Sequence, residues 1–133
     1  MNILLDTHVW IWSQESPEEF GAEALALLSA PDTKMYVSTV SSLEISRLIW
    51  GERLALAGSL RTWIRESLAM LLAETAPLSH ESSVLAYELP GDFHRDPADR
   101  MLVATAMAHD YLFMTADERI LSYQHVRSFD ARR

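Results

Sequence analysis

The segment Ile3-Leu4-Leu5-Asp6 near the N-terminus gives the first indication of the fold. Three consecutive apolar residues that end in an acid predict a strand buried on both faces, as in a parallel sheet, because a half-exposed strand would alternate apolar and polar positions. The pattern returns at Tyr111–Thr115, which is followed by Ala116 and Asp117. Shorter candidate strands lie at residues 35–37 and 74–78, and a weak last one lies around Val126. These segments predict four to five short strands.

Helical segments separate the predicted strands. We expect helices over residues 17–30, 40–50 and 59–72, one that begins after Ser79, and one that begins at Asp96-Pro97, with short helices near Trp10 and Ala116. Ser, Asp and Pro at these starts are typical of helix N-termini. Strands that alternate with helices predict an α/β fold, in which a parallel sheet is covered by helices on both faces.

Length and composition limit the class of protein. A chain of 133 residues suits one domain, 1–133. The absence of cysteine excludes a disulfide scaffold and thiolate metal sites. The N-terminus has no basic segment before its short apolar run, and no stretch is long enough for a membrane span, so we expect a cytoplasmic protein without membrane attachment. The net charge of −8 argues against a broad basic surface for nucleic acid.

Acidic residues follow the predicted strands. Asp6 ends the first strand, Glu44 lies about two turns beyond the second, and Asp117 follows the fourth. Asp96 and Asp99 open the helix before that fourth strand. Because parallel strands bring their carboxyl ends to one edge of the sheet, we expect these carboxylates to converge.

Converging carboxylates repel one another unless a cation neutralises them. Oxygen ligands without thiolate or paired imidazole favour Mg²⁺ or Mn²⁺. An ion of this kind suits the hydrolysis of phosphate esters, because it polarises the phosphoryl oxygen and acidifies water. Two other acidic α/β classes fit poorly. A phosphatase of the haloacid dehalogenase type needs an acid where His8 stands, and a receiver domain needs paired acids and a late lysine, whereas Lys34 is the only lysine.

The chain resembles the PIN-domain ribonucleases, in particular the VapC toxins of bacterial toxin–antitoxin pairs. The resemblance runs through the whole chain in order and is carried by four segments: residues 4–8 (LLDTH), 38–45 (STVSSLEI), 94–106 (HRDPADRMLVATA) and 114–117 (MTAD). It implies a PIN-like three-layer sandwich. It also implies four acids around Mg²⁺ or Mn²⁺, and cleavage of RNA inside the strand.

Carried over, the four catalytic and metal-binding acids are Asp6, Glu44, Asp99 and Asp117. Asp96 is the alternative third acid; otherwise it caps its helix and contacts a water of the metal. Thr7 and Thr115 would orient Asp6 and Asp117.

Several other residues are open to more than one interpretation. Arg100 could contact an RNA phosphate, neutralise the acids or pair with Asp96. The four tryptophans could stack on bases, but the core or a partner interface suits them better. His8 and His94 are left outside the catalytic set.

The resemblance also implies partners: an RNA substrate, a cognate antitoxin and a second copy of the chain. The apolar residues around Trp50, namely Leu48, Ile49, Leu54 and Leu56, are the candidate antitoxin groove or dimer face. The alternatives are a stand-alone PIN nuclease and a non-catalytic module that acts through an antitoxin. Four of the negative charges belong to the predicted metal site, so the acidity does not exclude local cleavage of RNA.

Overall fold

The computed structural model describes all residues 1–133 and has a parallel sheet at its centre. The sheet consists of β1 (Asn2–Leu5), β2 (Lys34–Ser38), β3 (Glu74–Ala76), β4 (Leu112–Thr115) and β5 (Ser128–Asp130). The strand order is β3-β2-β1-β4-β5, and every neighbouring pair is parallel. The prediction of a parallel sheet of four to five short strands is confirmed.

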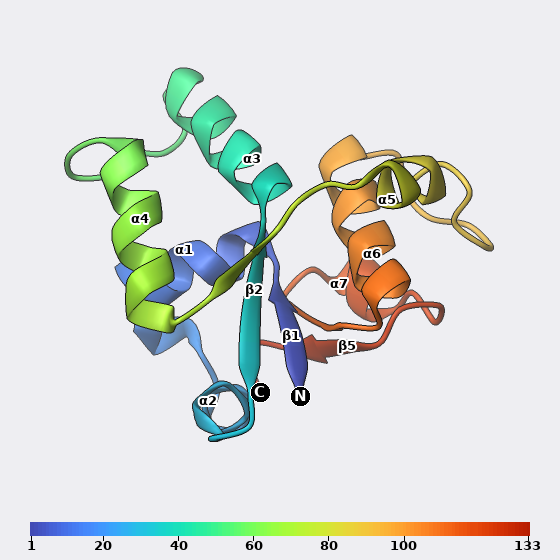
Figure 1. Cartoon of the computed structure of the whole chain (residues 1–133), viewed down its shortest axis with the longest axis horizontal. Coiled ribbons are helices and arrows are strands. Elements are labelled where there is room, and N and C mark those ends of the chain that lie inside the picture. The colour runs from blue at the N-terminus through green and yellow to red at the C-terminus, as the bar shows by residue number, and fades with distance from the viewer.

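Helices cover both faces of the sheet and complete a three-layer sandwich (Figure 1). One face carries α1 (Thr7–Glu15), α2 (Ala22–Ser29) and α4 (Leu60–Leu71), and the other carries α5 (His80–Leu85), α6 (Pro97–His109) and the short α7 (Glu118–Leu121). Helix α3 (Thr39–Trp50) rises from the end of β2 at the top of Figure 1. No helix has the length and apolarity needed to cross a membrane.

The central strands bury their side chains on both faces, as the run Ile3-Leu4-Leu5 predicts. Leu4 packs with Phe113 against the α5–α6–α7 layer, whereas Ile3 and Leu5 pack with Met114 against the other layer. All five side chains are at most 1% exposed. Burial of large aliphatic and aromatic side chains contributes roughly 1.5–3 kcal/mol each, so β1 and β4 contribute strongly to the stability of the fold.

The helix starts follow the predicted caps. The Ser38 and Ser59 side chains accept from backbone N–H groups at the starts of α3 and α4, and Ser79 does the same at α5. Asp96 accepts from the Asp99 N–H at the start of α6, and Pro97 occupies the first turn. Each cap satisfies a backbone donor that the helix leaves free.

The predicted helix over residues 17–30 is wrong in its first part. Residues 17–19 form a single 3-10 turn, η1 (Pro17–Glu19), and α2 begins only after Gly21. The C-terminal segment explains the break: Gly21 N–H donates to Ala131 O, Ala24 N–H donates to Arg133 O, and a Cβ on Gly21 would stand 1.9 Å from the Arg133 carbonyl carbon. The last residues are therefore docked on α2.

The last strand lies further along than predicted. The sequence suggests a strand around Val126, but β5 is Ser128–Asp130, because its pairing with β4 places Ser128 opposite Phe113. Val126 is buried in the core just before β5 begins.

Candidate active site

The predicted acids meet where the order of the strands reverses. From β1 the chain moves to β2 and β3 on one side, then returns to β4 on the other side. In such sheets a crevice opens at the carboxyl ends of the two strands that flank the reversal. Asp6 follows β1 directly, and Asp117 lies two residues after β4.

Asp6 is buried and firmly oriented. Its Oδ1 accepts from the Thr7 N–H at 2.8 Å, which caps α1. Its Oδ2 accepts from the Thr115 hydroxyl at 2.6 Å. The same hydroxyl accepts from the Asp117 N–H at 3.0 Å, so Thr115 couples the two acids across β1 and β4.

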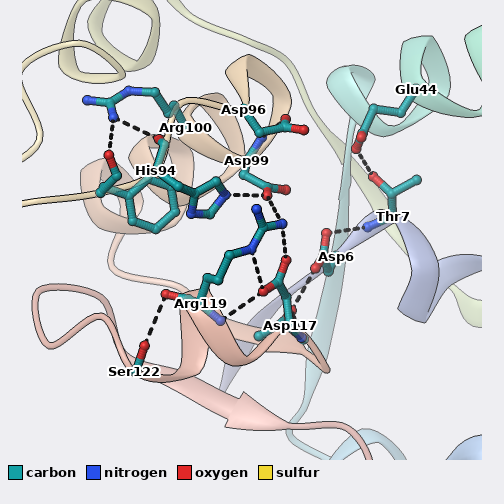
Figure 2. Close-up of polar contacts among 12 residues, drawn as sticks. Asp6, Thr7, Glu44, His94, Asp96, Asp99, Arg100, Asp117, Arg119 and Ser122 are labelled. Atoms are coloured by element: carbon teal, nitrogen blue, oxygen red, sulfur yellow. Dashed lines mark hydrogen bonds and ion pairs between the residues drawn. The ribbon is translucent and has the colours of Figure 1, made fainter.

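Glu44 projects from α3 towards the start of α1 (Figure 2). The Thr7 hydroxyl lies 2.5 Å from Glu44 Oε1 and 2.9 Å from the Ser41 hydroxyl. Thr7 therefore contacts Asp6 through its backbone and Glu44 through its side chain. The two threonines take different partners from those predicted: the Thr115 side chain orients Asp6, and the Thr7 side chain orients Glu44.

Asp96 and Asp99 lie on the first turn of α6 with different surroundings. Asp96 caps the helix and is half-buried. Asp99 is 9% exposed, and its Oδ2 lies 2.6 Å from His94 Nε2. His94, left outside the catalytic set by the sequence, is thus a direct neighbour of a candidate metal ligand.

Asp117 caps α7 and pairs with a residue that the sequence analysis missed. Arg119 donates through Nη2 to Asp117 Oδ2 at 2.9 Å and through Nε to Asp117 Oδ1 at 3.2 Å. Its Nη2 also lies 3.5 Å from Asp99 Oδ2, so one guanidinium contacts two of the acids (Figure 2). Arg119 lies two residues after Asp117, so the sequence could have indicated the contact with Asp117. It gave no indication of the contact with Asp99.

One hollow of about 640 Å³ is lined by all five acids. No three of the acidic and histidine side chains are placed so that they could hold a metal ion as they stand. Glu44 is turned to Thr7, Asp99 to His94 and Asp117 to Arg119. Coordination would therefore need side-chain rotations within the hollow.

Burial sets the electrostatics of these acids. It raises the pKa of Asp6 to about 6, with a further upward contribution from Asp99, while the Thr115 hydrogen bond opposes the shift. Burial likewise raises the pKa of Glu44 and of Asp99. The Arg119 hydrogen bonds lower the pKa of Asp117. Three acids of the hollow are thus costly to ionise without an added cation.

Arg100 does not make the predicted ion pairs with the acids, and its contact with an RNA phosphate stays a prediction. Its Nε donates to Ala86 O at 2.8 Å, and its Nη1 donates to Phe93 O and His94 O at 3.0 Å. The guanidinium also lies over the ring of Tyr87. Arg100 holds the loop before α6 against α5, and no ion pair joins it to Asp96.

The tryptophans divide between core and surface. Trp10 and Trp63 are buried, with ring centroids 4.9 Å apart. Trp12 is half-buried, and Trp50 is 86% exposed at the end of α3.

Fold and site together define a class of protein: a parallel α/β domain with an acidic hollow where the strand order reverses. The family model of the PIN domain matches residues 3–126, and this chain belongs to the PIN-domain family. It is 32% identical over 128 residues to Ribonuclease VapC22 of Mycobacterium tuberculosis, covering 94% of each chain.

Solved structures share the fold. The DNA-bound VapBC of Salmonella typhimurium matches with a TM-score of 0.69 at 17% identity, over 98% of this chain and 98% of that one. A toxin–antitoxin complex from Klebsiella pneumoniae matches with a TM-score of 0.64 at 15% identity, over 97% of both chains.

Proposed function

We propose that this protein is a metal-dependent endoribonuclease and the toxin of a toxin–antitoxin pair. The observation that carries the proposal is the meeting of Asp6, Glu44, Asp99 and Asp117 around one hollow of a PIN domain. Ribonuclease VapC22 of Mycobacterium tuberculosis supports the first part, and the structural likeness to the toxin–antitoxin complex of Klebsiella pneumoniae supports the second.

The residues of the hollow fit Mg²⁺ or Mn²⁺. All of the candidate ligands are carboxylate oxygens, which these ions prefer. The raised pKa values of Asp6, Glu44 and Asp99 show buried acids without enough positive charge around them. Arg119 already offers a cation to Asp117 and Asp99, so the hollow accommodates positive charge. Asp6, Asp99 and Asp117 would hold the ion, Glu44 would complete the site, and Asp96 would contact a coordinated water.

When bound, such an ion polarises the phosphoryl oxygen and acidifies the attacking water. The chain's own residues arrange the reaction. Thr7 and Thr115 keep both Asp6 oxygens in place, and Thr7 directs Glu44 towards the same hollow. Glu44 accepts a hydrogen bond from the water and orients it for in-line attack on phosphorus. Arg119 can donate to the phosphate once the substrate displaces it from Asp117.

Cleavage of a structured RNA in Mn²⁺, in EDTA and by the Asp6→Asn variant tests the proposal. We expect cleavage only by the parent protein in Mn²⁺. Asp32→Asn is the matched control, because Asp32 is an exposed aspartate outside the hollow. Equal cleavage under all conditions would point to a metal-free mechanism or a contaminant, and would refute the metal-dependent assignment.

The proposed antitoxin and homodimer contacts involve the apolar surface of α3 and α4. Leu43 and Trp50 are 65% and 86% exposed, and Leu43 borders a hollow with Ile49 and Leu60. Leu48, Leu54 and Leu56 are half-buried. Exposed apolar side chains of this size favour a protein partner. Light scattering of the parent and of Trp50→Ser, with and without a candidate antitoxin, tests whether this surface joins either assembly. An unchanged assembly in both cases would exclude Trp50 from it.

A further inference from the structure

Two arginines on the wall of the acidic hollow have no partner. Four arginines line it, of which Arg119 and Arg132 form ion pairs with nearby carboxylates. Arg47 and Arg53 also line it, yet neither forms an ion pair or a side-chain hydrogen bond. Both side chains are exposed. The hollow therefore has two free guanidinium groups beside its acids.

Arg47 is free although an acid lies close to it on the same helix. Glu44 precedes Arg47 by three residues on α3, a spacing at which side chains can pair. The Glu44 carboxylate instead accepts from the Thr7 hydroxyl, 2.5 Å away. The contact that prepares Glu44 for the site thus leaves the charge of Arg47 uncompensated.

Arg53 is held beside Arg47 by the turn that ends α3. Gly51 N–H donates to Arg47 O at 2.9 Å, and Arg53 N–H donates to Leu48 O at 2.8 Å. Between them Glu52 has a φ of 58°, a conformation disfavoured for a residue with a Cβ. This turn places Arg53 in the wall of the hollow.

A second hollow of about 400 Å³ continues from the first. The two share His8, Trp12, Leu48 and Arg53 among their lining residues. Arg53 therefore lies at their junction, and Arg47 lies on the acidic side of it. An extended polymer that runs from the acidic hollow into the second hollow would pass both guanidinium groups.

We propose that Arg47 and Arg53 bind backbone phosphates of the RNA strand that flank the phosphate to be cut. This inference rests on the proposed ribonuclease function. Guanidinium groups match phosphate oxygens in geometry and charge, and they carry no sequence preference at the backbone. A phosphate strand also needs local positive charge to approach a hollow that six acidic residues line. The observations favour RNA over an acidic protein segment because the free arginines line the same hollow as the acids.

Binding of a fluorescent single-stranded RNA, measured by anisotropy against salt concentration in EDTA, tests the proposal without turnover. The background is Asp6→Asn, and the variants are Arg47→Ala, Arg53→Ala and the double variant. Each lost phosphate contact should reduce the slope of log K against log salt by about 0.7, so the double variant should lose about 1.4. Arg53→Lys should retain most of the slope, because its charge remains.

Arg65→Ala is the matched control. Arg65 is an exposed arginine on α4 that lines neither hollow and forms no ion pair, so its removal should leave the slope unchanged. If the Arg47 and Arg53 variants keep the parent slope, the proposal is wrong. It is also overturned if they lose affinity only for an oligoglutamate peptide, which would assign these arginines to an acidic protein partner.

Cleavage by the otherwise unchanged protein separates the two levels of inference. With Mn²⁺, the double variant should raise KM while kcat stays within about threefold, because the contacts are uniform in ground and transition states. If the parent binds RNA through these arginines but cleaves none, the proposed function fails and the phosphate sites remain. If the parent cleaves RNA and the double variant has the same KM as the parent, the proposed phosphate sites are wrong and the proposed function stands.

Discussion

Carboxylates at two places in this molecule have opposite surroundings. In the acidic hollow, burial raises the pKa of Asp6 to about 6, and the side chain has a hydroxyl and an amide as partners but no ion pair. At the C-terminal end, Arg132 donates to Asp130 at 2.9 Å and 3.0 Å and lowers its pKa. The same guanidinium reaches Glu118 Oε1 at 2.6 Å.

The difference distinguishes Asp130, whose ion pair stabilises the fold, from Asp6, which lacks a counter-ion and is a candidate ligand for a cation. Asp130 has an arginine two residues away and stays partly exposed, so its ionisation costs little. Asp6 is 8% exposed, and although Arg119 and Arg132 line its hollow, neither pairs with it. A buried carboxylate with hydrogen bonds but no counter-ion is destabilising at neutral pH unless a cation binds.

The largest expected effect is the loss of cleavage on removal of a buried acid. Asp99→Asn should lower kcat at least about 100-fold, because it removes a candidate metal ligand. Asp130→Asn should leave cleavage unchanged. Asp96→Asn should cost only a few-fold, because asparagine still caps α6. RNA cleavage in Mn²⁺ measures all three, and loss in Asp96→Asn alone would assign the third ligand to Asp96.

The pH dependence of stability without metal comes next. A pKa raised from 3.8 to about 6 means that Asp6 stabilises the fold fully below its unfolded pKa and loses this contribution as pH rises through 6. The loss amounts to about 3 kcal/mol from Asp6 alone. Urea unfolding in EDTA between pH 4 and 8 measures it, and Asp6→Asn should flatten the profile.

Asp130 should act with the opposite sign. Its pKa is lowered, so its contribution is present above the unfolded value of 3.8 and is lost as pH falls through the folded pKa. Asp130→Asn should therefore lower stability near neutral pH and leave it unchanged at the acid end, where Asp130 is protonated in both states. A parent protein whose stability in EDTA rises between pH 4 and 8 would contradict the comparison.

Divalent ions should offset the loss of stability that ionisation of the buried acids causes. At one hundred times its Kd, Mn²⁺ adds about 2.7 kcal/mol to the free energy of unfolding. The gain should be larger at pH 7.5 than at pH 5, because Asp6 must be ionised to bind. Thermal unfolding with Mn²⁺ or EDTA measures it, and a gain retained in full by Asp6→Asn would place the ion elsewhere.

The smallest effect concerns Arg119, which contacts the hollow from its rim. Arg119→Ala should cost at most about 1 kcal/mol of stability, because its side chain is 60% exposed. It should tighten Mn²⁺ binding a few-fold, because the guanidinium no longer competes for Asp99 and Asp117. Calorimetry measures both, with Arg127→Ala as control for an ion pair outside the hollow. Weaker Mn²⁺ binding would show that Arg119 supports the ion instead.

Some contacts of the site were out of reach of the sequence. Arg119 reaches Asp99 and His94 reaches the same carboxylate, but these contacts depend on how α7 and the preceding loop pack on α6. Arg100 shows the same limit. Asp99 precedes it directly and Asp96 lies one helical turn away, yet it donates to the carbonyl oxygens of Ala86, Phe93 and His94.

Local patterns were sufficient for most of the strands and the capped helices, and the resemblance to a family supplied the candidate acids. Buried apolar runs, serine and aspartate caps and the acids that follow β1 and β4 act over a few residues, so they can be read along the chain. Contacts between distant segments decided the rest. The break at Gly21 requires Arg133, the orientation of Asp6 requires Thr115, and the freedom of Arg47 requires Thr7. These partners meet only when the sheet and its helices have packed, which is why the electrostatics of the site belong to the tertiary structure.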